Sequence, residues 1–233
     1  MDRGRCSSLD GIEDENRRQT LKHHGGDVAL VERVLNDFLP AFDALDGYRI
    51  QHDWERLLLI LTGKAFNSLK CAYDALLRAY YSQALALVRT VDEDHPTCLY
   101  VHNHRDEAEL WLKGRKVPTF ECMRSELGDV LKGKLRESYG ILSTFAHPRA
   151  AALAVTAGRL GGDLDLRLGG RFDPNHFTLA AYMLLPSATM MLGIPAIFLH
   201  DSQPEWMERI TATRDEVIAW LQRINEEVAA SSS

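Results

Sequence analysis

Apolar residues recur along most of this chain at the spacing of an amphipathic α-helix. In residues 27–45, for example, Val28, Leu35 and Phe42 fall on one face, and Asp27 precedes them at the place of an N-cap. Such an apolar face is buried where helices pack together. The pattern predicts helices at 27–45, 51–80, 82–102, 106–113, 119–127 and 134–146, an apolar helix from Asp173 to Leu199, and a last helix from Ser202 onward.

The pattern changes between residues 154 and 170. Residues 154–157 and 164–168 alternate or are β-prone, and glycines lie between and after them. Short β-prone runs bounded by glycines are typical of a hairpin. The sequence therefore predicts an all-α fold, a multi-helix bundle with a small β-hairpin at about 154–170, inserted before the last two helices.

The ends of the chain lack this periodicity. Residues 1–26 are polar and contain Gly25 and Gly26, so they are predicted to form a flexible N-terminal tail. Residues 27–228 then form a single helical domain, and residues 229–233 a disordered C-terminus. A chain of 233 residues is long enough to bury a substantial core in one domain.

Composition indicates a soluble protein of ordinary type. The formal net charge is −6, which gives no general attraction to a polyanion such as RNA. The N-terminus is polar and does not resemble a signal peptide, and the cysteines are widely scattered. These features predict reduced thiols and a cytoplasmic location.

One apolar segment resembles a membrane span. Residues 177–199 carry no charge and are long enough to cross a bilayer. However, Pro186, Gly193 and Pro195 interrupt the run, and its flanks lack the lysine and arginine expected beside an inserted helix. A helix buried on all sides within a bundle has the same composition. We therefore expect a core helix and no membrane partner.

The first candidate for chemistry is a pair of charged residues. Arg89 and Glu93 lie one helical turn apart within a largely apolar run, close enough for an ion pair. A buried arginine requires a carboxylate or a ligand anion to balance its charge. Two interpretations follow: a structural pair that links helices, or part of a site for a small anionic ligand.

A second polar set lies at the end of the helix predicted at 134–146. Tyr139, Ser143 and His147 recur every four residues, and Pro148 ends the helix. His147 could cap the helix C-terminus, or it could contact a ligand or act in catalysis. The candidate ligand-binding residues are Arg89, Glu93, Tyr139, Ser143 and His147, and the catalytic candidates among them are His147, Arg89 and Glu93.

Metal binding is a further alternative. His95, Cys98 and His102 follow i, i+3, i+7 spacing, so one helical face could offer nitrogen and sulfur ligands to zinc, with Cys122 as a fourth. This spacing is not a recognised zinc signature, and no glycine-rich phosphate loop, HExxH or GxSxG motif occurs. We therefore predict no metal and no cofactor.

The run ALALVRTVDE and the later YGILSTFAHP resemble uncharacterised bacterial helical proteins placed near the HEPN superfamily. The resemblance spans about residues 50–225 and is carried by the five candidate ligand-binding residues. It implies a helical, often dimeric protein, and active members cut RNA without metal through an Arg-x(4–6)-His motif. His147 departs from this motif, since its nearest upstream arginine is Arg136; the spacing does occur at Arg89 and His95.

Two functions remain open at this stage. The first is a helical module that binds a small anionic ligand or a partner, as a homodimer formed through the last two apolar helices. The second is a HEPN-type ribonuclease or toxin-like effector with RNA as its substrate. Whether the protein is an enzyme is left undecided by the sequence.

Overall fold

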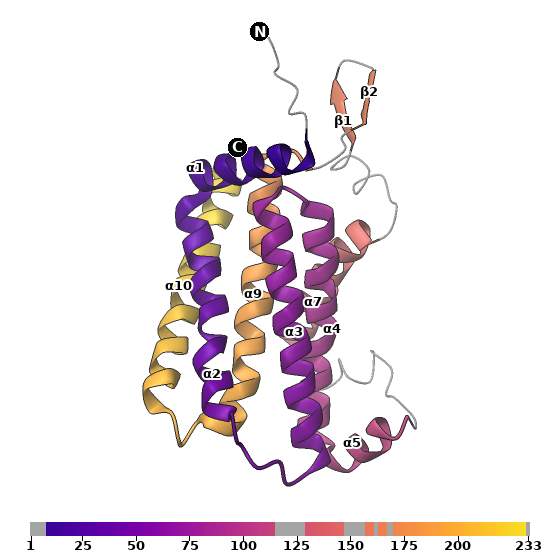
Figure 1. The fold of residues 1–233 in the computed structure, drawn as a ribbon, viewed down its shortest axis with the longest axis vertical. Coiled ribbons are helices and arrows are strands. Elements are labelled where there is room, and N and C mark those ends of the chain that lie inside the picture. The colour runs from indigo at the N-terminus through magenta and orange to yellow at the C-terminus, as the bar shows by residue number, and fades with distance from the viewer. Residues whose placement is uncertain (1–7, 115–128, 147–156, 161–162, 167–169, 232–233) are drawn as a thin grey trace.

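A computed structural model describes residues 8–114, 129–146, 157–160, 163–166 and 170–231 (Figure 1). Most of the described chain is helical and forms a bundle, so the all-α prediction is confirmed. The helices are α1 (Leu9–Asn36), α2 (Phe38–Leu45), α3 (Asp53–Leu77), α4 (Tyr81–Asn103), α5 (Arg105–Leu112), α7 (Asp129–Ala146), α9 (Pro174–Leu199) and α10 (Pro204–Ser231).

Helix α9 lies at the centre of the bundle, between α1 and α10 on one side and α3 and α4 on the other (Figure 1). By length and composition α9 could span a membrane, but 56% of its most apolar stretch is buried inside the protein. Its large side chains, among them Phe177, Leu184 and Met191, form much of the core. Helix α9 is apolar on all sides because neighbouring helices pack against it from several directions.

Two short strands, β1 (Ala157–Leu160) and β2 (Asp163–Leu166), precede α9. They pair antiparallel, with Ala157 opposite Leu166 and Leu160 opposite Asp163. Both lie within the range 154–170 in which the sequence predicts a hairpin. Residues 154–156, 161–162 and 167–169 of that range, and the helix predicted at 119–127, lie outside the described residues.

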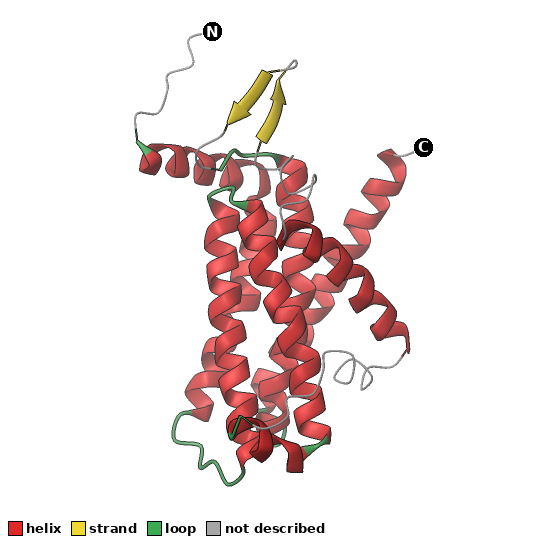
Figure 2. Ribbon diagram, turned by 90° about the vertical axis from the view of Figure 1, so that its right-hand side faces the viewer, coloured by secondary structure: helices red, strands yellow, loops and turns green. Residues whose placement is uncertain are grey.

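The prediction of a flexible N-terminal tail is wrong for residues 9–26. These residues form the first part of α1, and the Ser8 hydroxyl accepts a capping hydrogen bond from the backbone of Gly11 at 3.2 Å. The helix kinks at His24 (φ −130°, ψ 27°) and continues through both following glycines, so its first part lies across the end of the bundle (Figure 2). At the other end α10 continues to Ser231, so residues 229–231 are not disordered either.

Tertiary contacts explain why this polar segment is ordered: Glu13 accepts from the Tyr80 hydroxyl at 2.9 Å, and a buried amide, Asn16, makes several further bonds. The Asn16 side chain is 6% exposed, and its nitrogen donates to the carbonyls of Gly170 (2.7 Å) and Arg78 (3.2 Å). Its oxygen accepts from the backbone of Phe172 at 3.1 Å. These partners lie far away in the sequence, so the helix is stabilised by tertiary contacts that a local pattern does not reveal.

We expect Asn16→Ala to lower the free energy of unfolding by about 2 kcal/mol, because it leaves buried backbone groups without partners. Chemical denaturation measures this value. Lys22→Ala, on the exposed side of the same helix, is the control and should change stability by less than about 0.5 kcal/mol. Equal stability of the two variants would show that the first part of α1 is not anchored by Asn16.

Asp27, predicted as an N-cap, instead lies inside α1, because the helix begins eighteen residues earlier, at Leu9. Its carboxylate accepts from the Trp220 indole (2.7 Å) and the Arg223 guanidinium (3.1 Å) and contacts the His24 imidazole at 3.0 Å. The bond to His24 is the main reason that the pKa of Asp27 is lowered. Asp27 therefore connects α1 to α10.

Candidate functional site

The structure brings together three of the sequence-predicted site residues. Arg89 Nε lies 3.2 Å from Glu93 Oε1 one turn along α4, and Arg89 Nη2 donates to the Tyr139 hydroxyl of α7 at 2.5 Å. The guanidinium also lies 4.7 Å from the centre of the Tyr139 ring. The Arg89 side chain is 20% exposed, so these contacts hold a half-buried charge between α4 and α7.

The other two predicted residues are placed differently. Ser143 lies on α7, and its buried hydroxyl has no hydrogen-bond partner within the part of the chain that the structure describes. His147 lies outside the described residues.

Sequence reasoning missed a buried acid in the same run. Asp92 is 1% exposed and accepts hydrogen bonds from Ser138 of α7, at 2.7 Å, and from Ser187 of α9. Burial raises the pKa of Asp92. This group connects three helices, and the signal for it was an acid on the apolar side of α4, next to Val88 and Val91.

A second buried acid, Asp94, was also missed. It is 5% exposed, and its Oδ1 accepts from the ammonium of Lys64 on α3 at 2.6 Å. Its other oxygen, Oδ2, is buried without a hydrogen-bond partner among the described residues. Burial raises the pKa of Asp94, and the bond to Lys64 offsets part of that rise. A buried carboxylate oxygen without a donor is costly and therefore uncommon.

Asp94 lies in the wall of a pocket of about 330 Å³. We call it the α4 pocket; it is lined by Leu61 and Lys64 of α3, Glu93, Asp94 and Thr97 of α4, Trp111 of α5 and Tyr139 of α7. Glu93 and Tyr139 belong both to this pocket and to the predicted polar cluster. Arg89 therefore positions two of the pocket's side chains.

The metal hypothesis is wrong for the described residues. No group of three His, Cys, Asp or Glu side chains among them is placed to hold a metal ion, so His95, Cys98 and His102 do not form a site. His95 and Cys98 are buried, while the His102 ring packs on the edge of Trp54 with 5.8 Å between centres. Burial lowers the pKa of His95 to about 4 and raises the pKa of Cys98.

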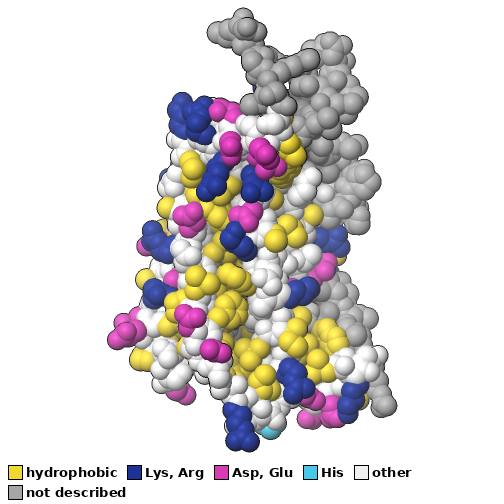
Figure 3. Space-filling view, in the orientation of Figure 1, with side chains coloured by type: hydrophobic (Ala, Val, Ile, Leu, Met, Phe, Trp, Pro, Cys, Tyr) yellow, Lys and Arg dark blue, Asp and Glu magenta, His cyan; other side chains and the backbone are white. Residues whose placement is uncertain are grey.

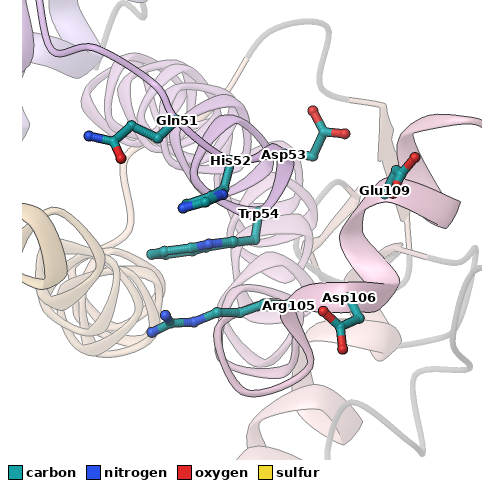
Figure 4. Close-up of a pocket in the computed structure, with 7 residues that line it drawn as sticks. All are labelled: Gln51, His52, Asp53, Trp54, Arg105, Asp106 and Glu109. Atoms are coloured by element: carbon teal, nitrogen blue, oxygen red, sulfur yellow. The ribbon is translucent and has the colours of Figure 1, made fainter.

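A larger hollow of about 580 Å³ lies between the start of α3 and α5 (Figure 4). The Arg105 guanidinium lies there 4.2 Å from the centre of the Trp54 ring, and the Phe198 ring stacks on the same indole with 5.9 Å between ring centres. The carboxylates of Asp53 and Glu109 pair with Arg56 and Lys113. Since Arg105 and Phe198 already lie against the Trp54 indole, a ligand in this hollow would have to compete with them for that ring.

No family model, curated protein or solved structure matches this chain. The geometry of the described residues is thus the basis for a functional argument. It consists of a half-buried ion-pair cluster, two buried acids and a pocket with aromatic and charged walls. Such a combination of a concave site with a few convergent polar groups is typical of a small-molecule site.

Proposed function

We propose that this protein is a helical module that binds a small organic molecule in the α4 pocket. The observation that carries the proposal is the set of convergent polar groups in the pocket wall, the carboxylates of Glu93 and Asp94 and the Lys64 ammonium bonded to Asp94, beside the Trp111 ring. A ligand with a hydrogen-bond donor and an apolar body would find a partner for each part there.

The construction of the pocket supports the proposal. Its walls come from four helices, α3, α4, α5 and α7, which hold side chains more rigidly than loops do. Trp111 and Tyr139 provide aromatic surface for the body of a ligand, and Arg89 fixes the Tyr139 ring through its hydroxyl and its face. The volume of about 330 Å³ is within the range of small-molecule sites.

Fluorine NMR of protein labelled with 5-fluorotryptophan tests the proposal. The chain has 4 tryptophans, and Trp111 is the one that lines the α4 pocket. We expect at least one of three probes (2-phenylethylamine, 2-phenylethanol and 3-phenylpropanoate) to shift the Trp111 signal at millimolar concentration. The signals of the buried Trp206 and Trp220 should not move.

Trp111→Phe assigns the signal, and Trp54 provides the matched control because it lines the other hollow. Probes that shift only the Trp54 signal would show that they bind in the hollow beside Trp54 and not in the α4 pocket. No shift of Trp111 with any probe would contradict the proposed function.

The HEPN-type ribonuclease stays a prediction. One of its candidate pairs, Arg89 with His95, is not favoured, because His95 is 7% exposed and an RNA phosphate would not reach its ring. For His147, incubation of the protein with RNA beside Arg89→Ala and His147→Ala would decide the matter. Cleavage that both variants lose would establish the ribonuclease.

The homodimer and the cytoplasmic location also stay predictions. Because α9 is largely buried within one chain, a dimer interface would have to use other surfaces, such as the exposed side chains of Ile218 and Val228 on α10. The face drawn in Figure 3 carries hydrophobic side chains interspersed with charged ones. Light scattering of the purified protein measures the oligomeric state.

A further inference from the structure

We infer that the ligand of the α4 pocket is an organic ammonium ion, a protonated amine on an apolar body, and not the small anion expected from the sequence. The inference rests on the proposed function and specifies its ligand. The ammonium group would lie against the Asp94 carboxylate, and the apolar body against Trp111.

The charges around the pocket do not favour an anion. Lys64 lines the pocket and Arg89 lies beside its Glu93 and Tyr139, and each already has a carboxylate partner, Asp94 at 2.6 Å and Glu93 at 3.2 Å. An anion would have to break one of these pairs and would then lie beside the released carboxylate. Like charges at such a distance repel each other strongly in a partly buried site.

The acids of the pocket also specify the chemistry. Glu93 and Asp94 both line it, and carboxylates only accept hydrogen bonds, so a ligand must bring a donor to them. An ionised donor forms a shorter and stronger bond to a carboxylate than a neutral donor does. Among common ligand groups, an ammonium ion meets this requirement and carries no acceptor that would repel the carboxylate.

The aromatic walls agree with a cationic ligand. The face of an indole attracts cations, and Trp111 lines the same pocket as Asp94. The Tyr139 ring already carries a cation over it, the Arg89 guanidinium at 4.7 Å, so we expect the ligand's cation to lie nearer to Trp111 than to Tyr139. A carboxylate beside an aromatic wall is a combination suited to an amine.

Lys64 gives a test in which a cation site and an anion site respond in opposite directions. In the proposed site, the Lys64 ammonium competes with the ligand for Asp94. Lys64→Gln should therefore tighten the binding of 2-phenylethylamine at pH 8 by about fivefold or more, as measured by calorimetry. The Lys64 side chain is 55% exposed, so we expect this variant to fold.

Lys70→Gln is the matched control. It removes the same charge from the same helix, but Lys70 is paired with Asp74 and does not line the α4 pocket. Its affinity for 2-phenylethylamine should stay within about twofold of the wild type. Tightening in both variants would mean that net charge, and not Asp94, governs binding, and would overturn the inference.

A second variant tests the acceptor itself. Asp94→Asn keeps the shape of the side chain, and it should weaken 2-phenylethylamine at least about tenfold while 2-phenylethanol changes little. If 3-phenylpropanoate or 2-phenylethanol shifts Trp111 and binds more tightly than the amine, the pocket is a ligand site but the inferred ligand class is wrong. If no probe shifts Trp111, the proposed function fails together with the inference.

Discussion

Gly170→Ala is expected to lower the free energy of unfolding by about 3 kcal/mol, the largest effect of any single methyl group that we predict. A Cβ atom at this position would lie 2.5 Å from the carbonyl oxygens of both Arg78 and Ala79. The atoms it meets are backbone, so no flexible side chain can move aside. The chain before α9 would have to shift and would weaken the bond between Gly170 and Asn16.

Chemical denaturation measures this effect, and Gly63→Ala is its control. Gly63 lies inside α3 with nothing within 4 Å of an added Cβ, so alanine there should stabilise the protein by up to about 1 kcal/mol. Because Asn16 and Gly170 belong to one junction, the double variant should lose less stability than the sum of the two. A Gly170→Ala protein as stable as the wild type would show that this close approach does not exist in solution.

Acidification from pH 7 to pH 4.5 is expected to remove about 2–3 kcal/mol of stability through His95 alone. Burial lowers the pKa of His95 to about 4 in the folded protein, against about 6.5 in the unfolded chain. The unfolded chain therefore takes up the proton first as the pH falls. The His95 contribution is complete above about pH 6.5 and is lost progressively as the pH falls toward 4.

Denaturation at a series of pH values, for the wild type and His95→Gln, isolates this contribution. Asp92 and Asp94 have raised pKa values and act in the opposite direction, but they are common to both proteins and cancel in the difference. His200→Gln is the control, because the His200 side chain is 73% exposed. If His95→Gln and the wild type lose stability in parallel, His95 does not stay neutral in the fold.

The helices were predictable where an apolar face repeats. The pattern placed α3, α4, α9 and α10 to within a few residues, because each buries a face that the sequence shows directly. The first part of α1 was missed because it is stabilised by tertiary contacts, above all those of Asn16, whose partners lie more than sixty residues away. Helix α4 continues through Pro96 to Asn103, although a proline removes a backbone hydrogen-bond donor from the helix interior.

The candidate site was predictable only in part. Arg89 and Glu93 were found because both lie on one helix, where spacing fixes which side chains meet. Lys64 and Asp94 lie on different helices, thirty residues apart, and no local pattern connects them. Trp111 appeared in the sequence only as part of a short helix, and its role in the pocket depends on how α5 packs against α3.

A crystal structure of the protein with 2-phenylethylamine bound tests the central claim most directly. We expect the amine nitrogen within about 3 Å of an Asp94 carboxylate oxygen, and the phenyl ring against Trp111. Density for the amine in the hollow beside Trp54, or in the α4 pocket with its nitrogen turned away from Asp94, would contradict the claim.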